Sequence, residues 1–116
     1  MTDLTGTWNT LVTDPSTPDK YKYVSEINVT QTGTFVMSLS APGWDTWQGH
    51  LAVDPAGEEM LTAACFQDGR PRIIQARLSQ DGNTLYGQWY IAGEPFAPKG
   101  GYLAKRRIST EKGSPS

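Results

Sequence analysis

Cysteine and histidine are nearly absent from this chain of 116 residues: each occurs once, as Cys65 and His50. A single cysteine excludes a disulfide within the chain and gives no sign of an oxidising compartment. One cysteine and one histidine are also too few for a metal cage of nitrogen and sulfur ligands. We therefore expect no metal site and no cofactor.

Long apolar runs and an excess of charge of one sign are also missing. No apolar segment approaches the roughly 20 residues that cross a bilayer, and the opening residues MTDLTGTW lack the basic and apolar stretches of a signal peptide. Ten basic and twelve acidic residues leave a net charge of -2, which provides no electrostatic reason to bind nucleic acid. These features predict a cytoplasmic protein that binds neither a membrane nor nucleic acid.

What the chain does contain is a regular alternation of apolar and polar residues. Ile27 and Val29 alternate with polar neighbours, and Phe35, Met37 and Leu39 continue the pattern after a Thr-Gly turn. Period-two alternation is typical of half-buried antiparallel strands. Division at the Gly, Asp and Pro residues that favour turns predicts strands at 6–13, 21–31, 34–40, 44–53, 59–67, 71–79, 83–92 and 100–108.

The connections between these strands are mostly short, which favours an up-and-down meander over a Greek key. A meander of about eight strands can close on itself and thereby remove its edges. The predicted fold is therefore all-β, a single up-and-down antiparallel barrel of about eight strands. The domain covers residues 1–108, and the polar residues 109–116 are expected to form a disordered tail.

A short pattern, L-x-G-x-W, occurs near both ends of the chain. It comprises Leu4, Gly6 and Trp8 at the start, and Leu85, Gly87 and Trp89 in the seventh predicted strand. In a strand these three positions share one face, so a glycine lies between two large apolar side chains. Glycine on the inner face of a small barrel makes room for a neighbour or lets the strand coil sharply. We expect both tryptophans to face inward.

The first copy of this pattern resembles the opening of the avidin-like and lipocalin-like proteins of the calycin superfamily. Those proteins are eight-stranded meander barrels that begin with G-x-W, and a basic residue of their last strand packs across that tryptophan. The resemblance implies that Trp8 and Arg106 form the floor of the barrel. It does not extend to a biotin site, because Thr10 occupies the position at which the avidin pattern has a ligand-binding asparagine.

The odd-numbered connections of a meander share one end of the barrel, and two of them are predicted to be long: 14–20 and 93–99. Aromatic side chains cluster at or near this end. An aromatic rim with few charges is typical of a small-molecule site, although rings in the interior could instead fill a solid barrel. The predicted ligand-binding residues are Tyr21, Tyr23, Trp44, Trp47, Tyr90 and Phe96, with Asp45 and Arg72 to hold a polar group.

The leading hypothesis is therefore a non-enzymatic barrel that binds a small apolar or aromatic ligand. No motif of nucleophilic or nucleotide chemistry is present; we expect His50 to point outward and Cys65 to be a buried, inert thiol. No catalytic residue is predicted. A cofactor-free cyclase or isomerase of a natural-product pathway remains the alternative, because a cavity that only folds a reactive substrate requires no motif.

A second alternative is a protein-interaction module. Ile73, Tyr86, Tyr90 and Leu103 fall on the outward parity of the last three predicted strands. A contiguous apolar patch on neighbouring strands usually marks an interface, and symmetric pairing is the commonest way to bury it. The sequence thus predicts a homodimer formed through strands six to eight.

Overall fold

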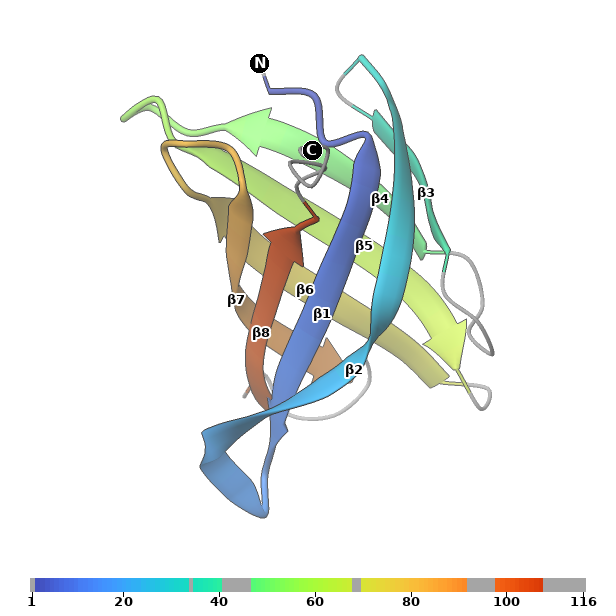
Figure 1. The fold of residues 1–116 in the computed structure, drawn as a ribbon, viewed down its shortest axis with the longest axis vertical. Helices are drawn as coiled ribbons and strands as arrows, with labels where there is room; N and C mark the ends of the chain where they lie inside the picture. Colours follow the sequence, from blue (N-terminus) through green and yellow to red (C-terminus); the bar gives the residue numbers. More distant parts are fainter. Residues whose placement is uncertain (1, 34, 41–46, 68–69, 92–97, 108–116) are drawn as a thin grey trace, which may run out of the picture.

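The computed structural model describes residues 2–33, 35–40, 47–67, 70–91 and 98–107. These residues form strands and no helix, so the prediction of an all-β fold is confirmed for the described part of the chain (Figure 1). The strands are β1 (Gly6–Asp14), β2 (Thr17–Thr32), β3 (Phe35–Ser40), β4 (Trp47–Val53), β5 (Glu59–Gln67), β6 (Arg70–Leu78), β7 (Thr84–Ile91) and β8 (Gly100–Arg106).

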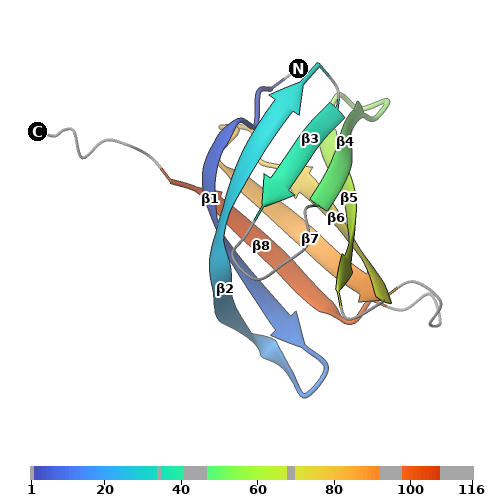
Figure 2. The ribbon, with the colours of Figure 1, turned by 90° about the vertical axis from the view of Figure 1, so that its right-hand side faces the viewer.

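Every strand pairs with the next one along the chain, and every pairing is antiparallel. β1 also pairs with β8, in a ladder that runs from Trp8 opposite Arg106 to Val12 opposite Tyr102. The strands therefore form one antiparallel sheet in which the first strand is also hydrogen-bonded to the last. Seen from two directions, the strands wrap around a common interior (Figure 1, Figure 2).

The alternation in the sequence sorts the side chains between the interior and the outer face. On β6, Ile74, Ala76 and Leu78 are buried, while Gln75 between them is exposed. Burial of a leucine or isoleucine side chain contributes about 1.5–3 kcal/mol to the stability of the fold. The core on the inner face of the sheet consists mainly of Leu4, Trp8, Ile27, Val29, Leu51, Leu61, Ala63, Ile74, Ala76, Leu78, Leu85, Tyr102 and Ala104.

The connection between β1 and β2 differs from its prediction. A long loop at 14–20 was expected, but β2 begins at Thr17 and Asp14 pairs directly with that residue. The Asp14 carboxylate accepts hydrogen bonds from the backbone and hydroxyl groups of Ser16 and Thr17, and Lys22 donates to it over 3.1 Å. These bonds lower the pKa of Asp14 and close a tight turn, so the two strands project beyond the rest of the sheet as a hairpin (Figure 1).

Trp8 and Arg106, the predicted floor, meet at one end of the interior. Trp8 is wholly buried, its indole Nε1 donates to the Leu4 carbonyl over 2.9 Å, and the Arg106 guanidinium carbon lies 4.6 Å from its ring centroid. A cation over an indole face contributes about 0.5–2 kcal/mol. The guanidinium also donates to the backbone carbonyls of Asp3, Thr5 and Gly82.

The residues that precede β1 cover this end. The Leu4 backbone N–H donates to the Gln31 side chain over 2.7 Å, and both the backbone N–H and the hydroxyl of Thr2 donate to the Glu59 carboxylate. Because Gln31 belongs to β2 and Glu59 to β5, residues 2–5 connect opposite parts of the sheet. This end of the interior is closed, which leaves the end with the odd-numbered connections for a site.

Candidate ligand-binding cavity

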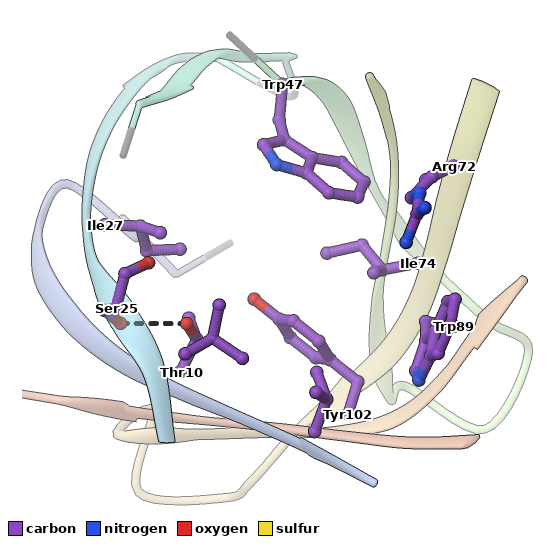
Figure 3. A pocket seen from close by; sticks show the side chains of 10 residues that line it. Thr10, Ser25, Ile27, Trp47, Arg72, Ile74, Trp89 and Tyr102 are labelled. Atoms are coloured by element: carbon purple, nitrogen blue, oxygen red, sulfur yellow. Dashed lines mark hydrogen bonds between the residues drawn. The ribbon is translucent and has the colours of Figure 1, made fainter. Parts of the chain in front are cut away.

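A cavity of about 170 Å³ lies in the interior (Figure 3). Its position follows from the strands that line it: Trp47 is the first residue of β4, Arg72 lies near the start of β6, and Tyr102 lies near the start of β8. It therefore lies toward the end with the odd-numbered connections. The lining residues are Thr10, Val12, Val24, Ser25, Ile27, Trp47, Arg72, Ile74, Trp89 and Tyr102.

Three aromatic rings form much of the wall. Trp47 and Trp89 are half-buried and pack against the core, and Tyr102 is buried with its hydroxyl pointing into the cavity (Figure 3). The Trp89 indole Nε1 donates to the Thr13 carbonyl over 2.8 Å, which fixes the orientation of that ring. Flat apolar walls of this kind suit an aromatic or aliphatic ligand.

The polar groups of the cavity differ in whether they already form hydrogen bonds. The Thr10 hydroxyl donates to the Ser25 carbonyl over 2.8 Å. Burial raises the pKa of Tyr102, so its phenol stays protonated at neutral pH and can donate a hydrogen bond. Arg72 lies with its guanidinium carbon 5.6 Å from the Trp89 ring centroid. None of the described lining residues is acidic, and the described part of the chain contains no cluster of three metal-ligating side chains.

The predicted site residues divide into three groups. Trp47 and Arg72 line the cavity together. Tyr21 and Tyr23 belong to the projecting hairpin and are 47% and 60% exposed, and Tyr90 lies on the outer face, where its hydroxyl donates to Gln88. These three tyrosines do not line the cavity. The remaining three predicted residues, Trp44, Asp45 and Phe96, lie outside the described residues.

The outward placement of the tyrosines follows from the irregular β1–β2 ladder, whose register shifts between Thr10 and Leu11. Tyr23 lies opposite Leu11, which itself lies opposite Leu103 of β8, and the Tyr21 hydroxyl lies against Gly101 of β8. Both rings therefore cover the outer face and do not stand at the rim. Sequence parity alone does not reveal a bulge that reverses the inward and outward order of the residues beyond it.

Sequence reasoning missed Trp89 and Tyr102 as site residues, although it expected Trp89 to face inward. The available signal was their position along the strand. Trp89 lies near the end of β7 and Tyr102 near the start of β8, so both are close to the end opposite Trp8. Inward parity combined with distance from the closed end would have selected them.

The other single residues of chemical interest lie as expected. His50 is exposed, and Cys65 is buried opposite Arg72 in the β5–β6 ladder. In the described part of the chain, no helix has the length and apolarity needed to cross a membrane.

The outward apolar residues of the last three strands share one face. Ile73 lies opposite Tyr90 across β6 and β7, and Tyr86 lies opposite Leu103 across β7 and β8. The row that contains Tyr86 and Leu103 extends beyond the residues predicted from the sequence. Leu103 lies opposite Leu11 on β1, and Leu11 lies opposite Tyr23 on β2. Tyr86 is 46% exposed. We call Tyr86, Leu103, Leu11 and Tyr23 the outer row.

Comparison with known proteins returned no match to any family model, curated protein or solved structure. Two features of this chain bear on its function: the aromatic cavity and the basic side chain in its wall.

Proposed function

We propose that this protein is a calycin-like up-and-down barrel of eight strands that binds a small apolar or aromatic molecule in its interior. The cavity walled by Trp47, Trp89 and Tyr102 carries this proposal. Pairing of β1 with β8 and stacking of Arg106 on Trp8 support the barrel and its resemblance to calycins.

The physical reason is that protein interiors are close-packed, with few voids larger than a water molecule. An unfilled apolar cavity forfeits dispersion contacts along its whole wall, and a ligand of matching shape restores them. Here the space lies between three rings and the aliphatic side chains of Ile27 and Ile74. The gain in dispersion energy on binding is therefore largest for a flat ring.

We expect a neutral single-ring probe to bind this cavity saturably. Fluorobenzene, followed by fluorine NMR, is a suitable probe because it does not rely on tryptophan emission. The Trp47→Ala protein should bind it at least about fivefold more weakly, because the ring loses one wall of its pocket. Tyr23→Ala removes an exposed aromatic ring outside the cavity and should leave the affinity unchanged.

Equal weakening by the two substitutions would place binding on the surface, and an absence of saturable binding to the folded protein would reject the proposed function. The same experiment addresses the cyclase or isomerase alternative. A bound candidate substrate that is recovered chemically altered would favour catalysis, and recovery of the unchanged molecule would favour binding alone.

We also propose that two copies associate through the outer row, which shares Tyr86 and Leu103 with the interface that the sequence suggests for strands six to eight. The register that aligns Leu11 and Tyr23 with Leu103 and Tyr86 lengthens the apolar surface across four strands. Such a surface is favourably removed from water by a second copy that presents the same residues.

A dimer should therefore be found by light scattering at tens of micromolar protein, and Tyr86→Glu should convert it to a monomer with an unchanged circular dichroism spectrum. The substitution brings a charge into the apolar contact. Thr62→Glu places the same charge on the exposed face of β5, away from the outer row, and should leave the dimer intact. A monomeric wild-type protein would contradict the proposal.

A further inference from the structure

Two arginines in this interior stack on tryptophans, and their contacts differ in a way that points to a ligand. At the closed end, Arg106 lies over Trp8 and donates hydrogen bonds to three backbone carbonyls. In the cavity, Arg72 lies over Trp89 at 5.6 Å. Its Nε is shielded from solvent, and no described residue accepts a hydrogen bond from it.

The stacking on Trp89 leaves this group unsatisfied. A ring face interacts with the face of the guanidinium, whereas the N–H donors point outward in the guanidinium plane. A shielded donor that has no acceptor among the described residues is costly. The two residues that lie opposite Arg72 in the neighbouring strands are Cys65 and Ile91, and neither carries a carboxylate.

The missing partner has a defined chemistry. A guanidinium presents pairs of parallel N–H donors, which match the two oxygens of a carboxylate. No described residue of the lining is acidic, so the cavity itself holds no competing anion. The Tyr102 hydroxyl, which points into the same space, offers a further donor (Figure 3).

The size of the cavity limits the rest of the molecule. A cavity of about 150 Å³ in an apolar core accommodates one benzene ring. The space here measures about 170 Å³, enough for a single ring that carries a small substituent. The rings of Trp47, Trp89 and Tyr102 would contact such a ring, and its substituent would reach Arg72.

We propose that the ligand is a small aromatic carboxylate, with a single ring between the aromatic walls and its carboxylate bound by Arg72. This inference rests on the proposed function and specifies its ligand class. Arg72 is then the residue that selects an anion over a neutral ring of the same shape.

Benzoate and benzamide test the selection, because they share a shape and differ in charge. Isothermal titration of the full chain should show at least about tenfold tighter binding of benzoate. Benzoate should also shift the Nε–H proton resonance of Arg72 and slow its exchange with water. Arg72→Met keeps the aliphatic stem beside Trp89 but removes the donors, and it should abolish the preference.

Arg77→Met provides the matched control. Arg77 belongs to the same strand but forms ion pairs with Asp54 and Glu58 at 3.3 and 2.8 Å, and it does not line the cavity. The Arg77→Met protein should retain the full preference for benzoate. Loss of the preference in both variants would show that Arg72 has no specific role.

The outcomes also separate this inference from the proposed function. Saturable binding of fluorobenzene together with equal affinities for benzoate and benzamide would overturn the carboxylate proposal and leave the binding cavity intact. Failure of all three probes to bind the folded protein would overturn both. If Arg72→Met does not fold, the wild-type affinity ratio and the Arg72 Nε–H resonance decide the question alone.

Discussion

Replacement of Trp8 by alanine is expected to lower the free energy of unfolding by about 3–5 kcal/mol. Trp8 has no exposed surface and is among the largest fully buried side chains of the described interior. The substitution opens a cavity in the floor, leaves the Leu4 carbonyl without the indole donor and removes the ring beneath Arg106. Urea unfolding followed by circular dichroism measures the loss.

Trp47→Ala is the matched control for this prediction. It removes the same side chain from the half-buried wall of the cavity, where part of the ring already meets open space. The free energy of unfolding should fall there by less than about 2 kcal/mol, because the half-buried Trp47 ring contributes less buried apolar area than Trp8. Equal losses at the two positions would show that Trp8 does not form a specific floor, and a loss below about 1 kcal/mol at Trp8 would contradict its role in the core.

Gly87→Ala is expected to destabilise the protein by about 3 kcal/mol or more, although only one methyl group is added. The new Cβ would overlap the Gln75 carbonyl group and lie 2.7 Å from the Ala76 Cα. These are backbone atoms of the neighbouring strand β6, which cannot move without separation of the β6–β7 ladder. The unfolding midpoint in urea, read from tryptophan fluorescence, reports the effect.

Gly33→Ala is the matched control, because it isolates the conformational cost of replacing a glycine. Gly33 has a φ of +61°, and a Cβ there would meet nothing within 4 Å. This substitution should cost about 1–2 kcal/mol through the left-handed backbone conformation. If Gly87→Ala costs no more than Gly33→Ala, the close approach of β6 and β7 is not a structural requirement.

The strands were predictable because their signals are local. Alternation of apolar and polar residues within six to nine positions identifies a strand and its buried face, and Gly, Asp and Pro identify the turns. The contact of the Trp8 indole with Arg106 was also predictable, from the resemblance. In both cases an approximate strand count is enough to place the residues.

The cavity was only partly predictable because it depends on strand register and closure. Trp47 and Arg72 were identified, but Trp89 and Tyr102 were not, since inward parity does not separate a filled region from an open one. The Asp14 turn extended β2 by four residues relative to the predicted start. The register shift between Thr10 and Leu11 left Tyr23 on the outer face.

The sequence by itself thus determined the all-β class, the positions of most strands and the inward or outward direction of most side chains. These properties follow from the period of two and from turn chemistry, which act over a few residues. The tertiary structure decided which inward side chains share a space and that Arg72 lacks a partner within the described residues. That result depends on the register between strands, including the shift between Thr10 and Leu11, and register is set by pairing between distant segments.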